Sequence, residues 1–168
     1  MITDLKLLNE AFAEPTSARA RVLPGGFAVD GATFSALRGR IASWTLVRKL
    51  FREERLVCWS NGGERSASGR LCADCPSRGE CGRRLRLFLE EVEGEHADGG
   101  RRLGGITLEM NFTSGRNFLA YAQRLACAQL EVQDVPARLT VIDRGGWGEV
   151  CFVQVRPLGS AGEDEHAS

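Results

Sequence analysis

The stretch Arg83-Arg84-Leu85-Arg86-Leu87-Phe88-Leu89 alternates between aliphatic and other side chains from Arg84 onward. Successive side chains of a β-strand point to opposite faces, so the three leucines share one face and Arg84, Arg86 and Phe88 share the other. We predict a half-buried strand whose exposed face carries two arginines and an aromatic ring. Such a face suits contacts to phosphates and unpaired bases. A solvated face with Phe88 partly covered is the alternative.

Four cysteines precede this strand in the spacing C-x13-C-x2-C-x5-C, namely Cys58, Cys72, Cys75 and Cys81. The two-residue gap lets two thiolates converge on one ion, and four thiolates form a closed, tetrahedral, structural Zn²⁺ site. The residues between these cysteines are mostly Ser, Gly, Asn and Arg, so a metal is a suitable organiser for a segment with little apolar material. We predict one structural zinc ion as the cofactor. An iron–sulfur cluster, disulfides and separate core cysteines are the alternatives.

The rest of the chain predicts a mainly β (α+β) fold. Strands are expected at residues 27–29, 55–59, 83–89, 106–110, 138–143 and 149–155, and a long extended strand, with a helix as the alternative, at residues 34–51. Thr113-Ser114 is expected to cap a helix that runs to about residue 128 and buries Phe118, Tyr121 and Leu125. One helix before the last two strands is typical of the OB-fold, a small antiparallel barrel. We therefore predict an OB-like barrel with a four-cysteine zinc-binding loop insertion.

The predicted domain organisation has three parts. Residues 1–15 form an amphipathic helix, because Leu5, Leu8 and Phe12 recur at helical spacing. Residues 20–156 form the OB-like domain, with the zinc loop at residues 58–81. Residues 157–168 form a flexible acidic tail, because they contain few apolar side chains to bury.

Composition and charge narrow the class of protein. The 168-residue chain is 43% apolar and 26% charged and has zero net charge, which is typical of one globular domain. It has neither a transmembrane-length apolar run nor a secretory signal, so we expect a reducing, cytoplasmic location and no membrane partner. Cys127 and Cys151 are expected to be buried core thiols. Between Arg38 and Phe88 there are 12 basic and 5 acidic residues, a local excess that favours nucleic acid as a partner.

Three tryptophans and one further arginine complete the candidate nucleic-acid contacts. Trp44, Trp59 and Trp147 are candidate stacking platforms, and packing in the core or zinc loop is the alternative for each. Arg48 begins a basic run that is interrupted by Glu53-Glu54, so a solvated face is an equally good interpretation there. The sequence shows no catalytic constellation or phosphate-binding glycine loop, and we do not expect an enzyme.

Several motifs taken together resemble a known family. They are the turn Gly26–Gly31, the strand Ser43–Arg48, the segment Cys58–Gly63, the knuckle Cys72–Pro76, and the Thr113-Ser114 helix with Phe118 and Tyr121. Over residues 27–155 the chain resembles bacteriophage and mobile-element proteins described as single-stranded-DNA-binding proteins of OB type with a four-cysteine zinc loop.

This resemblance implies binding of single-stranded DNA during replication or recombination of a phage or mobile element. Replication or recombination proteins are then further expected partners, and oligomerisation stays open. A zinc-containing scaffold of a nucleoprotein complex and an RNA-binding protein are the alternatives.

Overall fold

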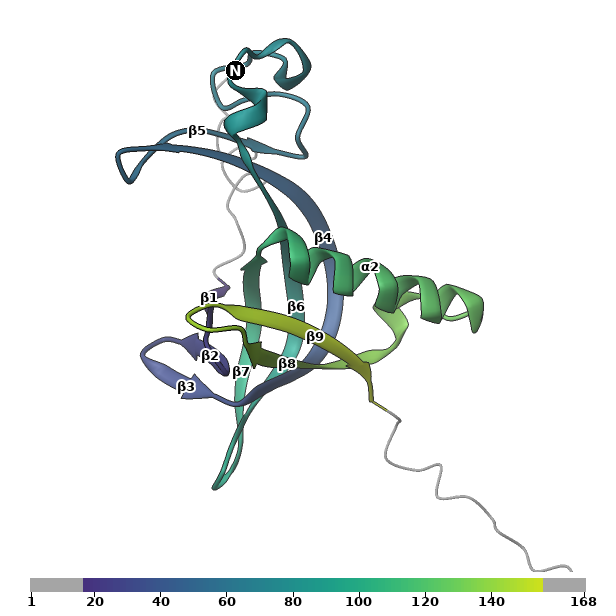
Figure 1. Cartoon of the computed structure of the whole chain (residues 1–168). Coiled ribbons are helices and arrows are strands. Elements are labelled where there is room, and N and C mark those ends of the chain that lie inside the picture. The colour runs from purple at the N-terminus through teal and green to yellow at the C-terminus, as the bar shows by residue number, and fades with distance from the viewer. Residues whose placement is uncertain (1–16, 156–168) are drawn as a thin grey trace, which may run out of the picture.

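The computed structural model describes residues 17–155 (Figure 1). The predicted helix at residues 1–15 and the predicted tail at residues 157–168 therefore lie outside the described residues. The described elements are β1 (Ala18–Leu23), β2 (Gly26–Val29), β3 (Ala32–Phe34), β4 (Ala36–Arg52), β5 (Arg55–Asn61), β6 (Gly82–His96), β7 (Gly99–Met110), α2 (Phe112–Cys127), β8 (Pro136–Asp143) and β9 (Gly148–Gln154).

These strands form one sheet in the order β3-β2-β1-β7-β6-β4-β8-β9, with β5 also paired to β4. Every pairing is antiparallel except that of β1 with β7. The prediction of a mainly β fold with one helix between strands is confirmed, since α2 lies between β7 and β8 in the chain. The predicted small antiparallel barrel is not confirmed, because the described strands form an open path with β3 and β9 at its ends.

The two halves of this path nevertheless approach each other beside Gly148, at the start of β9. A Cβ atom on Gly148 would come within 2.5 Å of the Leu23 carbonyl oxygen at the end of β1 and within 2.5 Å of the Val141 side chain. Only a glycine allows this approach of the β8–β9 hairpin to β1. The hairpin is therefore packed directly over the end of the β1 strand.

The buried side of the sheet packs against α2, which contacts β9 and β6. Phe118, Tyr121 and Leu125 are buried, as predicted from their helical spacing. The predicted Thr113-Ser114 cap is wrong. The helix is instead capped by Asn111, whose extended backbone lets its side chain accept a hydrogen bond from the Ser114 amide.

The predicted burial of Cys127 is wrong. Cys127 is exposed because it ends α2 on a side away from the buried Tyr121 and Leu125, two residues beyond Leu125 along the helix. Cys151, on β9, is half-buried. Neither of these cysteines belongs to the four-cysteine cluster.

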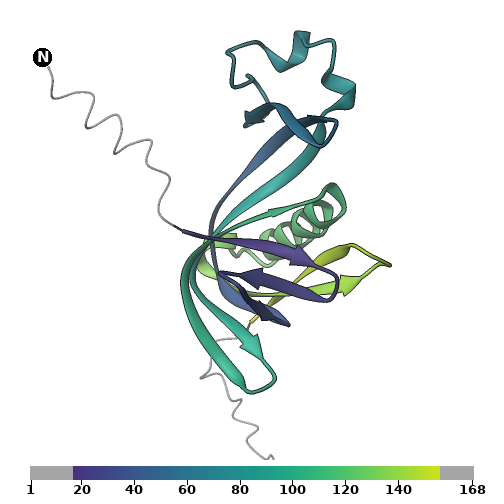
Figure 2. The same ribbon diagram turned by 90° about the vertical axis from the view of Figure 1, so that its left-hand side faces the viewer.

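One long strand has nearly its predicted bounds, and another is longer than the sequence predicted. The extended segment at residues 34–51 is confirmed as β4, whose pairing with β6 shifts register between Arg38 and Arg40 and again between Ile41 and Ser43. The alternating stretch 83–89 is only the first part of β6, which continues through the acidic residues to His96. Figures 1 and 2 show the upper parts of β4 and β6 projecting beyond the sheet and carrying residues 55–81, which we call the cysteine lobe.

Candidate nucleic-acid interface and cysteine site

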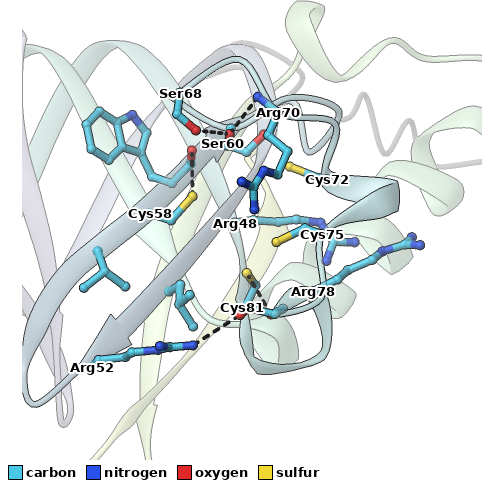
Figure 3. A pocket seen from close by; sticks show the side chains of 15 residues that line it. Arg48, Arg52, Cys58, Ser60, Ser68, Arg70, Cys72, Cys75, Arg78 and Cys81 are labelled. Atoms are coloured by element: carbon cyan, nitrogen blue, oxygen red, sulfur yellow. Dashed lines mark hydrogen bonds between the residues drawn. The ribbon is translucent and has the colours of Figure 1, made fainter.

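The cysteine lobe brings the four predicted ligand side chains to one pocket of about 360 Å³ (Figure 3). Cys58 comes from β5, where it pairs with Leu50 of β4. Cys72 begins one 3₁₀ turn, and Cys75 closes it with a hydrogen bond from its amide to the Cys72 carbonyl oxygen. Cys81 closes a second 3₁₀ turn, Arg78–Glu80, in the same way. The short turns place the Cys72, Cys75 and Cys81 side chains along this pocket.

The donor set in this pocket fits a structural zinc ion, because it offers four thiols and no competing carboxylate or imidazole lines it. Burial raises the pKa of the Cys81 thiol, and the Cys75 and Cys58 thiols raise it further, while Arg48 opposes them. Across residues 17–155, no group of three or more His, Cys, Asp or Glu side chains is arranged to hold a metal ion.

Two predicted nucleic-acid residues also lie at this pocket. Arg48 points among the cysteines, and its Nε atom is buried with no hydrogen-bond partner in the described part of the chain (Figure 3). Trp59 follows Cys58 on β5, lines the same pocket and is largely exposed. A zinc ion held by four thiolates carries a net charge of about −2, so Arg48 is placed to neutralise part of it.

A basic face lies on the side of the sheet that points away from α2. It is formed by alternate residues of β1, β7, β6 and β4, and we call it the outer face. The register places Phe88 beside Thr107 and Arg86 beside Glu109, while Arg19 lies beside Thr107 in the parallel pair. The members of the outer face are Arg19, Arg21, Ser43, Thr45, Lys49, Arg84, Arg86, Phe88, Thr107 and Glu109.

Glu109 organises the cations of the outer face. Its carboxylate lies 2.6 Å from Lys49 Nζ, 3.3 Å from Arg86 Nη2 and 3.8 Å from Arg84 Nε. Burial opposes ionisation of this carboxyl, but hydrogen bonds and charge from Lys49 and Arg86 outweigh that cost, so the pKa of Glu109 is lowered from its ordinary value of 4.5. One carboxylate thus pairs with three cations from neighbouring strands, and the outer face keeps an excess of positive charge.

Trp147 stands at one end of the outer face. It lies in the β8–β9 turn, which Asp143 stabilises by accepting hydrogen bonds from the amides of Gly145 and Gly146. The turn places the exposed Trp147 ring in the same pocket as Arg21 and Arg84, about 450 Å³ in volume. Positive charge and an exposed indole therefore meet beside the end of β1.

Trp44 faces the opposite side of the sheet. Its ring lies 5.3 Å from that of Phe118 of α2, although 42% of the residue is exposed. The structure thus divides the predicted contacts among three places. The outer face and its end hold Arg84, Arg86, Phe88 and Trp147, the cysteine pocket holds Arg48 and Trp59, and the α2 side holds Trp44.

Sequence reasoning missed three cations of the outer face. Lys49 belongs to β4, and the exposed Arg19 and Arg21 belong to β1, which was not predicted as a strand. The alternation Ala18-Arg19-Ala20-Arg21-Val22 is the signal that could have revealed them, because it places both arginines on one face of a strand.

No protein family, curated protein or solved structure gives a significant match to this chain. Any functional conclusion therefore rests on the geometry of these sites. Among residues 17–155, no helix has the length and apolar character needed to cross a bilayer.

Proposed function

We propose that this protein binds single-stranded DNA on its outer face. The observation that carries the proposal is that five cations, Arg19, Arg21, Lys49, Arg84 and Arg86, share one face with two aromatic rings, and within residues 17–155 only three of them pair with the Glu109 carboxylate. Cations neutralise phosphates and release counterions, while Phe88 and Trp147 offer stacking surfaces that tolerate any base sequence. The protein then acts as a binding module rather than an enzyme.

We propose further that the fold is of OB type. Three features support this assignment: β4, β6 and β7 form an antiparallel meander, α2 follows it, and β8 returns to the opposite edge of β4 before β9. In this assignment, the cysteine lobe is an insertion between the first two barrel strands. The β8–β9 turn joins the last two strands, and these two loops commonly flank the ligand in OB-folds. Here Trp147 of the β8–β9 turn lines one pocket of the outer face together with Lys49, which pairs with Gly82 at the base of the lobe.

The four cysteines are proposed to hold one zinc ion, Cys58, Cys72, Cys75 and Cys81 being the ligands. The ion would supply structural cross-linking of a lobe that is poor in buried apolar residues. Arg48, which points among these cysteines, would then act on the metal centre rather than on nucleic acid.

A titration with oligo(dT), followed by tryptophan fluorescence at 50 mM salt, tests the proposal. We expect quenching, because Trp147 stacks on bases, and weaker binding of a duplex of equal length, because paired bases cannot reach the rings. Equal affinity for duplex and single strand, or no binding, would contradict it. Competition with oligo(rU) distinguishes an RNA-binding protein.

A scaffold role is the second candidate, and one observation favours it. The cysteine lobe and the β4–β5 hairpin expose several large apolar side chains, as protein-contact surfaces do, namely Phe51, Leu56, Val57, Trp59 and Leu71. Replication or recombination proteins of a phage or mobile element, in a cytoplasmic setting, are the partners proposed from the sequence resemblance. Binding of this protein to a replication or recombination protein in the absence of DNA would favour this role.

A further inference from the structure

An apolar groove lies on the α2 side of the sheet, away from the outer face. It has a volume of about 260 Å³ and is lined by residues of β4, β6 and the first turns of α2. Trp44, Leu46, Phe112 and Leu119 line it, and each of these residues is between 38 and 56% exposed. Such a contiguous group of exposed large apolar side chains marks a contact surface.

The rim of this groove is positive. Arg83 and Arg116 line it, and no acidic side chain does. Arg83 lies over the Phe112 ring at 5.6 Å from the centroid, and within residues 17–155 neither Arg83 nor Arg116 has an ion-pair partner. A complementary occupant therefore carries bulky apolar side chains together with carboxylates.

The chain itself contains such a segment. Residues 3–14 carry Leu5, Leu8 and Phe12 at the i, i+3, i+7 spacing with which amphipathic helices enter apolar grooves. Over residues 1–16 there are three carboxylates, Asp4, Glu10 and Glu14, against one lysine. Both the apolar spacing and the sign of the charge thus match the groove.

The point at which this segment joins the fold argues against the groove of the same molecule. The Ser17 hydroxyl is 2.7 Å from that of Thr107, on the outer face. The groove extends from β6, two strand spacings from β1, to β4, three spacings away, so the lateral distance alone is about 10 to 14 Å. The chain must in addition pass around the sheet edge to the α2 side. Only Pro15 and Thr16 separate residue 14 from Ser17, and three residue steps reach about 11 Å.

We propose that residues 3–14 of one molecule dock in the Arg-rimmed groove of a second copy. The contact is heterologous, since a segment meets a groove, so it forms either a closed dimer by reciprocal exchange or an open chain of molecules. The proposal does not depend on nucleic-acid binding.

The first experiment uses full-length variants and a labelled synthetic peptide of residues 1–16. Leu8→Glu disables the protein's own segment and leaves the groove intact, so this variant should bind the peptide. Adding Leu119→Glu, or separately Arg116→Glu, should weaken peptide binding about tenfold or more, because each removes apolar burial or reverses a rim charge. Both side chains are on the exposed surface of α2, so folding should persist. Val153→Glu, at an exposed position of β9 outside the groove, is the matched control.

The second experiment is sedimentation of the full-length proteins without DNA. The wild-type protein should self-associate, while Leu8→Glu alone and Leu119→Glu alone should sediment as monomers. A mixture of these two variants should form one-to-one complexes, because one supplies the segment and the other the groove.

Three results would overturn the proposal. They are a monomeric wild-type protein that binds no peptide, peptide binding that survives both groove substitutions, and a mixture of variants that stays monomeric. Loss of oligo(dT) affinity in Leu119→Glu but not in Leu8→Glu would assign the groove to nucleic acid instead.

Discussion

Replacing Arg19 and Arg21 by alanine should flatten the salt dependence of single-strand binding. Both arginines are exposed on β1, lie on the outer face and have no ion-pair partner within residues 17–155, so both are available to phosphates. If three or four cations of the outer face engage phosphates, log affinity falls with log salt at a slope of about −2 to −3, since each contact contributes about −0.7. Between 50 and 200 mM salt, the wild-type protein should then lose roughly 15- to 60-fold in affinity.

The double variant should have a slope that is shallower by about 1.4 and should lose only about 2- to 10-fold over the same range. Fluorescence titrations with oligo(dT) at four salt concentrations measure this slope. The double variant Arg101→Ala with Arg102→Ala is the matched control, because this exposed pair lies at the start of β7, near the turn that joins β6 and β7. An unchanged slope in the β1 variant, or an equal loss in the control, would refute the assignment of the outer face.

Three further outcomes are expected. Metal analysis should find about one zinc ion per chain. The Cys75→Ser variant should lose the ion and have a lower melting temperature, because zinc-binding free energy is largely folding free energy. Iron with visible absorbance, or no metal, would contradict the zinc site. Trp147→Ala should weaken oligo(dT) binding by about 1–3 kcal/mol without changing the salt slope, since stacking carries no counterions. Glu109→Gln should lower the free energy of unfolding near neutral pH by roughly 1–3 kcal/mol. Because the pKa of Glu109 is lowered on folding, its stabilisation is present above the ordinary carboxyl value of 4.5 and is lost as pH falls through the folded pKa. The difference between variant and wild type in urea titrations should therefore vanish in acid, and a constant difference would contradict the ion network.

The parts of the structure that sequence predicted are those with a local signal. The alternation after Arg84 correctly placed the three leucines on one face of β6 and Arg84, Arg86 and Phe88 on the other, although Arg86 and Phe88 are half-buried. The four cysteines line one pocket, and the zinc ion that their spacing predicts stays a prediction. In β4, the same alternation places Trp44 on one face and Ser43 and Thr45 on the other. The sequence did not reveal this, because the apolar residues of this long segment have no clear period. Asn111 was overlooked as a cap because Thr113 and Ser114 also favour that position.

The parts that sequence missed depend on long-range pairing. Nothing near Arg19 and Arg21 indicates that β1 joins β7, because a parallel pairing leaves no turn between its partners. Lys49 was read as part of a charged run, and only the approach of β7 brings it to Glu109. The outer face is therefore a property of the assembled sheet, although each of its strands has a readable pattern.

The pairing of β1 with β7 has a consequence for the order of folding. Ala18 pairs with Ile106, and Arg19 with Thr107, so each contact closes a loop of 88 residues. Closing such a loop costs conformational entropy before the contacts repay it, whereas the β6–β7 hairpin forms between near neighbours. The short β1–β3 segment should therefore dock late, on a meander that has already formed. It should also open most readily in the native protein, so that local unfolding removes Arg19 and Arg21 together and bares the edge of β7.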